Sequence, residues 1–355
     1  MTQGNAMKTL RVNLGENSYD ILIGTNTLSQ IGSYVESKGG KVFIISDTNV
    51  APIFANTVMD SLLERGYDCK LMVLPAGEPT KSINSITPIY SSMLKFNLTR
   101  KDLVVTLGGG VIGDLGGFVA STYLRGVDFV QVPTSLLAQV DSSVGGKVAV
   151  DLPEGKNLVG SFYQPKLVFI DTAALEDLPD AYYIDGMAEV IKYGCIKDEK
   201  LFNLLEGIKS RDEFMQKAED IIYTCCDIKR RVVEVDEKDN GERMLLNFGH
   251  TYGHAIEKYY NFTGYSHGQA VAIGMVFISA ISEKLGQSEK GTTERIVNIL
   301  KQYGLPTQDK VEPKDVISAI LNDKKNFGKK LHVVLLEKIG KSFTYPTSAE
   351  YFLNK

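Results

Sequence analysis

The stretch Leu103-Val104-Val105-Thr106-Leu107-Gly108-Gly109-Gly110-Val111-Ile112-Gly113 decides the fold of the first half of the chain. Its first five residues are mostly apolar and β-branched and predict a buried strand of a parallel sheet. The glycines that follow match GxGxxG, in which backbone amides at a helix N-terminus approach a pyrophosphate. A glycine-rich turn that only packs a helix against a sheet has the same pattern, so both interpretations stay open on this stretch alone.

Apolar runs of the same kind alternate with helical stretches over the first 175 residues. The further runs are Ile21 to Ile23, Lys41 to Ser46, Cys69 to Leu74, Phe129 to Pro133 and Leu167 to Ile170. Several are short, β-branched and bounded by Gly, Asp or Pro, which is typical of buried parallel strands. At least two strand-helix units precede the glycine-rich stretch, whereas in an ordinary dinucleotide-binding motif they follow it.

The pattern changes after about residue 175 to long amphipathic segments, at Asp212 to Val235, His267 to Leu285 and Thr292 to Tyr303. Such segments predict helices. A chain of 355 residues also exceeds what one hydrophobic core usually serves. We therefore expect an α/β nucleotide-binding domain with a parallel sheet over residues 1–175, and a mostly α-helical metal-binding domain over residues 176–355.

Composition excludes several classes of protein. The formal net charge is −4 and charged residues make up 23% of the chain, so no basic stripe suited to nucleic acid is present. The four cysteines are too few and too irregularly spaced for a disulfide framework, which suits a reducing cytosol. No run of about eighteen apolar residues could span a bilayer, and Met1 to Leu10 do not resemble a signal peptide. We expect a cytoplasmic protein without a nucleic-acid or membrane partner.

Histidines cluster in the second half of the chain. His250 and His254 stand four residues apart in NFGHTYGHAIE, so a helix would place both imidazoles on one face, and His267 follows in a separate segment. Thr251 occupies the position where the protease motif HExxH requires its glutamate, so a protease is not indicated. A bare HxxxH pair often binds no metal, so a carboxylate partner is needed.

Glu189 and Lys192 supply charges on an otherwise apolar helical segment. An unpaired charge there would be costly. Two histidines and a carboxylate with an open position form a catalytic zinc arrangement. The residues alone therefore predict a metal site that pairs the helical histidines with Glu189.

Several polar loops follow the predicted strands. Asp47 could bind a ribose or cap a helix, and the loop from Gly77 to Lys81 could bind a polar ligand or simply be solvated. The stretch from Asp141 to Lys147 resembles a P-loop, but Asp141 replaces its first glycine and Val148 its Ser/Thr, which excludes an ATPase.

Two further groups suit an anionic, hydroxylated ligand. Lys156 and Asn157 lie on a second glycine-rich loop, where a cation and an amide could contact such a ligand. Arg125 adds a further basic group, or is simply an exposed surface residue.

Six ordered motifs resemble those of the 3-dehydroquinate synthase family of sugar-phosphate cyclases: GGGVIGDLGGF, DSSVGGK, GKNLVG, MAEVIKYG, NFGHTYGHAIE and HGQAVAIGM. The resemblance covers nearly the whole chain. It implies a dehydroquinate synthase-like fold with an N-terminal NAD-binding domain and a C-terminal helical domain. It also implies one divalent metal, zinc or cobalt, and a homodimer.

The resemblance also implies roles for individual residues. The metal ligands would be Glu189, His250 and His267, which frees His254 for catalysis or substrate binding. NAD would be held by Asp47, Gly77, Glu78, Lys81, Gly109, Gly110, Val111, Ile112, Gly113, Asp114, Thr134, Ser135, Lys147, Lys156 and Asp177. Substrate would contact Arg125 of the partner subunit, Asp141, Lys147, Asn157, Lys192, Lys229, Arg243, Asn247, His254 and one of Lys324 and Lys325. The catalytic residues would be His254, Lys192, Asn247 and Arg243.

The implied reaction belongs to the shikimate pathway, which leads to chorismate and the aromatic amino acids. A lyase would convert 3-deoxy-D-arabino-heptulosonate 7-phosphate to 3-dehydroquinate and phosphate. The steps would be transient oxidation by NAD, phosphate elimination, reduction, ring opening and intramolecular aldol closure.

Two departures from the family pattern lie near residue 180. The chain has Leu178-Pro179-Asp180-Ala181-Tyr182 where the family commonly has Leu-Pro-x-Arg-Glu, and Asp177 replaces the usual Thr of a cofactor loop. Three alternatives stay open: another sugar-phosphate cyclase such as 2-deoxy-scyllo-inosose synthase, a metal-dependent polyol dehydrogenase, and a non-catalytic binding protein with a structural metal. Gly241-Glu242-Arg243 with Asn247 favours dehydroquinate synthase over its relatives.

Overall fold

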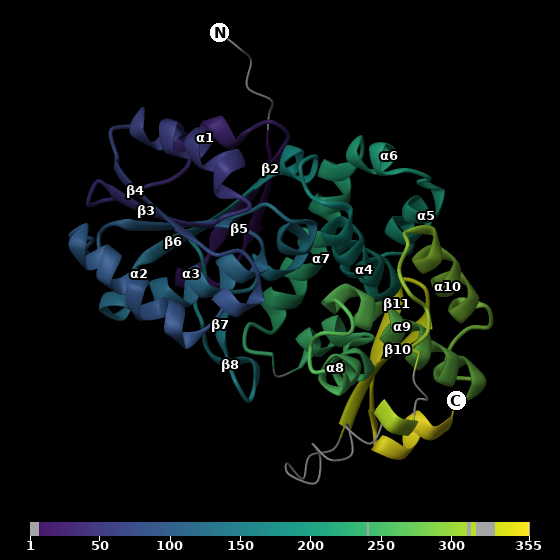
Figure 1. The fold of residues 1–355 in the computed structure, drawn as a ribbon. Coiled ribbons are helices and arrows are strands. Elements are labelled where there is room, and N and C mark those ends of the chain that lie inside the picture. The colour runs from purple at the N-terminus through teal and green to yellow at the C-terminus, as the bar shows by residue number, and fades with distance from the viewer. Residues whose placement is uncertain (1–6, 240, 311–313, 317–330, 355) are drawn as a thin grey trace. The chain divides into compact units, whose positions relative to one another are not determined.

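The computed structural model describes residues 7–239, 241–310, 314–316 and 331–354, and the chain divides into two compact units (Figure 1). Unit 1 comprises Met1–Leu178 and Met215–Lys238, and unit 2 comprises Pro179–Phe214 and Asp239–Lys355. The change of pattern near residue 175 lies close to the first crossing between the units. The sequence did not indicate that residues 215–238 return to unit 1. The division into functional domains at residues 175 and 176 stays a prediction.

Unit 1 is built on a seven-stranded sheet with the order β1-β2-β9-β6-β5-β3-β4. The strands are β1 (Lys8–Val12), β2 (Tyr19–Gly24), β3 (Lys41–Asp47), β4 (Asp68–Leu74), β5 (Leu103–Gly108), β6 (Asp128–Pro133) and β9 (Leu167–Asp171). Only the pairing of β1 with β2 is antiparallel, and all other pairs are parallel. The predicted strands are all present within two residues of their expected bounds.

The sheet is buried on both faces because successive side chains of a strand point to opposite sides. In β3, Phe43 and Ile45 belong to one hydrophobic cluster, and Val42 and Ile44 belong to another. Helix α1 (Ala51–Leu63) packs in the second cluster. Continuous apolar runs, rather than alternating ones, are therefore the pattern that such strands require.

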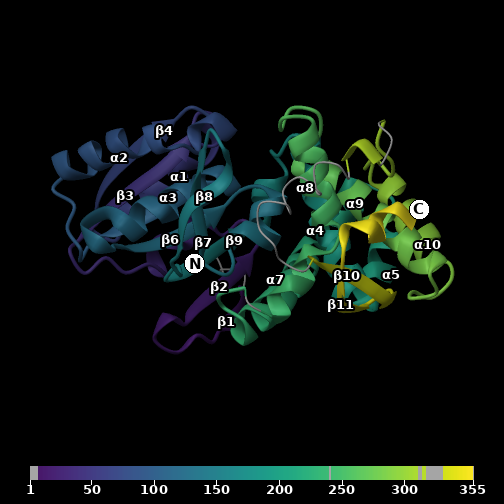
Figure 2. The same cartoon turned by 90° about the horizontal axis from the view of Figure 1, so that it is seen from below.

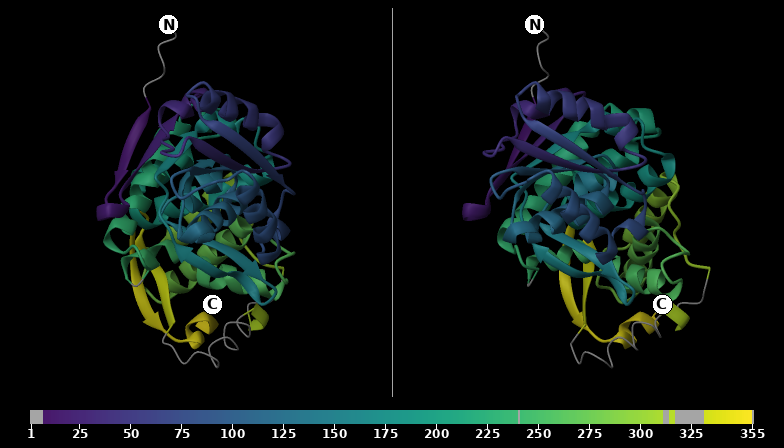
Figure 3. Two further views of the ribbon diagram at one scale, coloured as in Figure 1. Left: turned by 90° about the vertical axis from the view of Figure 1, so that its left-hand side faces the viewer. Right: turned by 60° about the vertical axis from the view of Figure 1, so that its left-hand side comes forward.

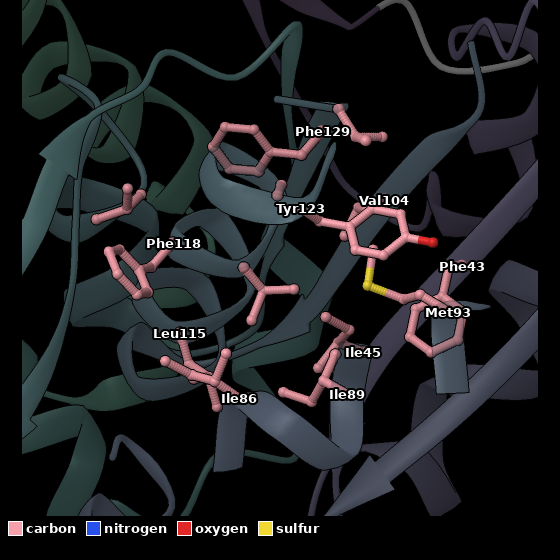
Figure 4. Packing of buried hydrophobic residues seen from close by; sticks show 14 of the residues in the cluster. Phe43, Ile45, Ile86, Ile89, Met93, Val104, Leu115, Phe118, Tyr123 and Phe129 are labelled. Atoms are coloured by element: carbon pink, nitrogen blue, oxygen red, sulfur yellow. The ribbon is translucent and has the colours of Figure 1, made fainter. Parts of the chain in front are cut away.

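Helices α2 (Ile83–Lys95) and α3 (Gly110–Thr122) cover the other face of the sheet, opposite α1 (Figure 1). Figure 4 shows the packing on this face, where Ile89 and Met93 of α2 and Leu115 of α3 surround side chains of β3 and β5. Helix α3 thus begins at the carboxyl end of β5, as the glycine-rich stretch predicts.

Three further elements belong to unit 1. An antiparallel hairpin joins β7 (Lys147–Leu152) to β8 (Gly155–Phe162). A short π-helical segment covers Ala138–Ser142. Helix α7 (Ala218–Val235) packs against β1, β2 and the π-helical segment. The expected single segment from Asp212 to Val235 is in fact divided between the short helix α6 (Arg211–Met215) and α7.

Unit 2 is mostly helical. Its longer helices are α4 (Asp180–Lys197), α5 (Glu199–Gly207), α8 (His250–Tyr259), α9 (His267–Lys284) and α10 (Thr292–Gln302). Helix α9 packs against α8, α4 and α10, and Figure 2 shows α4, α8 and α9 side by side. The predicted helices at residues 267 and 292 end one residue earlier than expected.

An antiparallel hairpin of β10 (Leu331–Lys338) and β11 (Lys341–Thr347) completes the described part of unit 2, and its two long strands are visible in Figure 3. The sequence analysis did not identify this hairpin. Among the described residues, no helix combines the length and hydrophobicity needed to cross a bilayer. The predicted fold class, an α/β domain with a parallel sheet followed by a mostly helical domain, is confirmed.

Glycines allow α8 and α9 to approach closely. A Cβ at Gly274 of α9 would lie 1.9 Å from the carbonyl oxygen of Gly249, and one at Gly253 of α8 would lie 3.0 Å from that of Ala270. Gly249 itself has a φ of 80°, which favours glycine. Because α8 begins at His250 and α9 at His267, this contact determines how close the two imidazoles lie.

We predict that Gly274→Ala lowers the free energy of unfolding of the metal-free protein by about 1–3 kcal/mol, the usual cost of overpacking a core. The backbone of Gly249 must move to admit the methyl group, so the midpoint of urea unfolding should fall. Gly207→Ala is the control, because a Cβ there meets no atom within 4 Å. A midpoint for Gly274→Ala equal to that of the control would contradict this account of the helix contact.

Candidate metal centre and cofactor-binding loops

Three predicted ligands converge in unit 2. Glu189 lies in the middle of α4, and His250 and His267 are the first residues of α8 and α9. One ligand atom from each lies within 4.8 Å of the others. The Nε2 atoms of His250 and His267 lie 3.5 Å and 3.8 Å from Glu189 Oε1.

Because Glu189 is fully buried, its carboxylate needs positive charge beside it. Its exposed fraction is 0%, and neither carboxylate oxygen accepts a hydrogen bond from the described part of the chain. Lys192, equally buried, forms an ion pair with Oε2. The other oxygen, Oε1, faces the two imidazoles. Lys192 compensates part of the charge of Glu189 at Oε2, and a divalent cation among the three groups would compensate Oε1 as well.

The imidazole of His250 is prepared to act as a metal ligand. Burial, and then the nearby charge of Lys192, hold the pKa of His250 well below its usual value. The neutral ring can donate its Nδ1 hydrogen to the carbonyl oxygen of Phe248, 3.1 Å away. This tautomer leaves the lone pair of Nε2 directed at Glu189.

His254 lies apart from Glu189. Its ring centroid is 5.3 Å from that of His250, as expected for two residues one helical turn apart, but its side chain is 59% exposed. The pairing of His250 with His254 that the residues alone suggested therefore does not form the cluster around Glu189. The structure brings His267 to that carboxylate instead.

Sequence analysis missed one residue of this region, Glu257. It is buried on α8 and forms a second potential ligand group with His254 and His267. Burial lowers the pKa of His267, but contact with Glu257 and the charge of Glu189 raise it above its usual value overall. The signal in the sequence was the spacing His250, His254, Glu257, which places all three on one helix face.

The predicted cofactor residues of unit 1 gather at one edge of the sheet. Asp47 ends β3, Gly77 and Glu78 follow β4, the segment 109–114 follows β5, and Thr134 and Ser135 follow β6. These are the carboxyl ends of neighbouring parallel strands, where α/β sheets bind ligands. Asp47 is not the N-cap of α1, which is Val50, but its Oδ1 accepts hydrogen bonds from the amides of Asn49 and Val50 in the turn before that helix.

The two glycines at the start of α3 lie close to serine side chains. A Cβ at Gly109 would lie 3.3 Å from Ser135 Oγ, and one at Gly110 would lie 3.1 Å from Ser142 Oγ. A side chain at either position would push against the neighbouring serine, whereas glycine leaves the first amides of α3 accessible to an anion. The geometry fits a pyrophosphate.

Buried polar contacts join the neighbouring cofactor residues. Lys81 Nζ contacts Asp114 Oδ2 at 2.6 Å and Asn157 Oδ1 at 2.5 Å. Burial lowers the pKa of Lys81, but the charge and hydrogen bond of Asp114, together with the charges of Glu78 and Asp151, offset this effect and raise the pKa overall. Lys156 Nζ lies 4.0 Å from Glu78 Oε1.

Three other predicted site residues are exposed. Asp177 is exposed after the 3-10 helix Thr172–Leu175, and Lys147 is exposed at the start of β7. Arg125 is exposed and has a φ of 67°, an uncommon value for a residue other than glycine.

The predicted substrate residues divide between the units. In unit 1, Lys229 of α7 is buried and its Nζ lies 2.9 Å from Asp141 Oδ1. In unit 2, Arg243 is buried and Asn247 is exposed, both in the 3-10 helix Glu242–Asn247 that precedes α8. Lys324 and Lys325 lie outside the described residues.

Two family models match the chain in order, "3-dehydroquinate synthase N-terminal" over residues 71–185 and "3-dehydroquinate synthase C-terminal" over residues 186–326. The chain is 58% identical over 349 residues to the 3-dehydroquinate synthase of Clostridium botulinum strain Alaska E43, covering 98% of this chain and 100% of that one. It is 45% identical over 352 residues to that of Pelobacter propionicus, covering 98% of each.

Solved structures agree with these matches. A 2-deoxy-scyllo-inosose synthase complexed with carbaglucose-6-phosphate, NAD+ and Co2+ matches with a TM-score of 0.87 at 25% identity, over 98% of both chains. An iron-containing alcohol dehydrogenase matches with a TM-score of 0.67 at 15% identity, over 99% of this chain and 98% of that one, which shows a shared fold alone. Because the 3-dehydroquinate synthases match in sequence over essentially their whole length, the chain belongs to the 3-dehydroquinate synthase family.

Proposed function

We propose that this chain converts 3-deoxy-D-arabino-heptulosonate 7-phosphate to 3-dehydroquinate and inorganic phosphate. The observation that carries the proposal is the cluster of Glu189, His250 and His267, an open two-histidine, one-carboxylate site in a chain of this family. A structural metal site is usually closed by four protein ligands, so this cluster argues against a non-catalytic binding protein.

The cluster would hold one divalent cation, zinc or cobalt. The related 2-deoxy-scyllo-inosose synthase contains Co2+ and a 2-epi-5-epi-valiolone synthase of the same fold contains Zn2+. When bound, such a cation supplies Lewis acidity, which lowers the pKa of a substrate hydroxyl. Lys192, buried beside Glu189, adds a positive charge that favours an ionised oxygen at the same place.

The loops at the carboxyl edge of the sheet would hold NAD. The first amides of α3 suit its pyrophosphate, and Asp47 suits a ribose hydroxyl. Glu78, Lys81, Lys147, Lys156, Thr134, Ser135 and Asp177 complete the proposed set. When bound, NAD supplies a hydride acceptor that is regenerated in the same turnover, so no NADH accumulates.

The substrate carries a carboxylate and a phosphate, and cationic side chains suit both ends. Lys147 and Lys229 with Asp141 and Asn157 in unit 1, and Lys192, Arg243, Asn247 and His254 in unit 2, are the proposed contacts. His254 is exposed and near the metal cluster, which suits a residue that transfers a proton to or from substrate.

We also infer that the protein is a cytoplasmic homodimer in which Arg125 reaches the substrate phosphate of the partner subunit. Its exposure and its unusual backbone conformation are compatible with a role outside its own unit. One of Lys324 and Lys325 would complete the substrate set.

A second candidate function is a related cyclase such as 2-deoxy-scyllo-inosose synthase, favoured by the close match in fold to that enzyme. Gly241-Glu242-Arg243 with Asn247 favours dehydroquinate synthase. A polyol dehydrogenase would have little use for so many cations at the substrate.

One prediction of the proposed function concerns the products of the reaction. Purified protein with NAD, a divalent metal and the heptulosonate phosphate should release inorganic phosphate with no net NADH and form a carbocyclic product. Phosphate and NADH are followed in one reaction, with metal-chelated protein as the control. Stoichiometric NADH without phosphate would move the assignment to a dehydrogenase. Absence of both signals, with turnover of a hexose phosphate, would favour the second candidate.

Another prediction distinguishes the roles of His250 and His254, the two histidines of α8. His250→Ala should lose metal and activity together, because it removes a ligand. His254→Ala should keep its metal and lose activity by about 10²–10⁴-fold, the usual effect of removing an acid-base group. Metal content is measured by elemental analysis after dialysis. Equal loss of metal in both variants would overturn the assignment of their roles.

A further inference from the structure

Glu257 is a buried carboxylate that the proposed reaction does not use. It lies on α8 with 5% of its surface exposed. Its Oε1 lies 3.5 Å from Nδ1 of His267, and its Oε2 lies 4.0 Å from Nε2 of His254. One carboxylate therefore lies between a proposed metal ligand and a proposed catalytic residue.

The two ring nitrogens of His267 have different neighbours. Nε2 lies 3.8 Å from Glu189 Oε1, inside the ligand cluster, and Nδ1 faces Glu257. The pair at 3.5 Å needs to shorten by only a few tenths of an ångström to form an ordinary hydrogen bond. A carboxylate can only accept such a bond, so it selects the ring form with hydrogen on Nδ1.

His250 shows the same arrangement with a different acceptor. Its Nε2 faces Glu189 at 3.5 Å, and its Nδ1 lies 3.1 Å from the carbonyl oxygen of Phe248. Both histidines thus have an acceptor beside Nδ1 and direct Nε2 at Glu189, the arrangement in which a neutral ring leaves the lone pair of Nε2 for a cation. Acceptors of this kind around a metal centre commonly affect metal affinity by about 10–100-fold.

We propose that Glu257 is a positioning residue of the metal centre, which fixes His267 in the tautomer and orientation that bind the cation. This inference rests on the proposed ligands Glu189, His250 and His267. The second oxygen of Glu257 lies 4.0 Å from Nε2 of His254, too far for a hydrogen bond, so the proposal concerns His267 alone.

A direct ligand role for Glu257 is less well supported by the geometry. The alternative group of His254, Glu257 and His267 includes an imidazole that is 59% exposed. The group around Glu189 has instead a fully buried carboxylate, whose Oε1 lies 3.5 Å and 3.8 Å from the Nε2 atoms of His250 and His267. The experiment below separates the two roles.

The test is metal affinity, measured by competition of Zn2+ with a chromophoric chelator. Glu257→Gln keeps the shape of the side chain and removes its charge, and should weaken Zn2+ binding about 10–100-fold. The visible absorption bands of the Co2+ form should change as well, because the orientation of a ligand changes. An affinity within two-fold of wild type, with unchanged Co2+ bands, would overturn the proposal.

Glu283→Gln is the matched control. Glu283 lies sixteen residues after His267 on α9, about 24 Å along the helix axis. It accepts hydrogen bonds from the amides of Gly291 and Thr293, so its substitution also removes a carboxylate contact in unit 2. The control should keep wild-type metal affinity. An equal loss of affinity in both variants would mean a general structural effect and would overturn the proposal.

A double-mutant cycle tests whether Glu257 acts through His267. In a His267→Ala background, Glu257→Gln should cause no further loss of Zn2+ affinity. A further loss as large as in the wild-type background would show that Glu257 acts on the metal independently of His267 and would overturn the positioning role.

Two further variants keep the result interpretable. Unfolding of the metal-free proteins is followed by circular dichroism, and if Glu257→Gln does not fold, Glu257→Asp replaces it, with the charge kept and the reach shortened. That variant should also bind Zn2+ more weakly, and wild-type affinity would overturn the proposal. His250→Ala tests the ligand assignment itself. If this variant binds Zn2+ like wild type, the proposed metal centre is wrong. If His250→Ala loses Zn2+ binding while Glu257→Gln keeps wild-type affinity, only the positioning role is refuted.

Discussion

A carboxylate without contact to water is the constraint around which unit 2 is built. Glu189 lies at 0% exposure in the middle of α4, where its charge is stable only beside compensating positive charge. Lys192 supplies part of that charge from the next turn of the same helix. The imidazoles of His250 and His267 face Oε1. The glycine contact between α8 and α9 holds the first residues of the two helices close together, so that both imidazoles reach one carboxylate.

Unit 1 meets a related constraint, because it buries two lysines. Lys81 is buried but contacts Asp114 and Asn157, and Lys229 is buried but contacts Asp141. Burying a lysine is tolerable when a carboxylate lies beside it, and such pairs keep long side chains in fixed positions. A site that must bind an anionic ligand thus has its cations placed before the ligand arrives, which lowers the ordering cost of binding.

The sequence predicted those features that depend on local pattern. The buried strands were evident because a sheet covered on both faces requires continuous apolar runs, as in Val42 to Ile45. The metal ligands Glu189, His250 and His267 were predicted only from the family resemblance. Spacing alone favoured His254 as the partner of His250, because the two lie one helical turn apart. Which histidine reaches Glu189 is decided by packing between α4, α8 and α9, and that packing has no local signature. Glu257 has a local signal, its spacing from His250 and His254, but its burial and its contact with His267 come from that packing. The hairpins β7–β8 and β10–β11 were not identified, although β10 contains a buried apolar run at residues 333–336.

The return of α7 to unit 1 bears on how the protein is made. On the ribosome, the sheet of unit 1 is complete once β9 has emerged, but the helix that packs on β1 and β2 follows some fifty residues later. Until then Asp141 lacks the ammonium group of Lys229. Neither unit is a continuous piece of the chain, so truncation near residue 178 yields an incomplete first unit. A nascent chain that ends before α7 therefore lacks the helix that packs against β1 and β2.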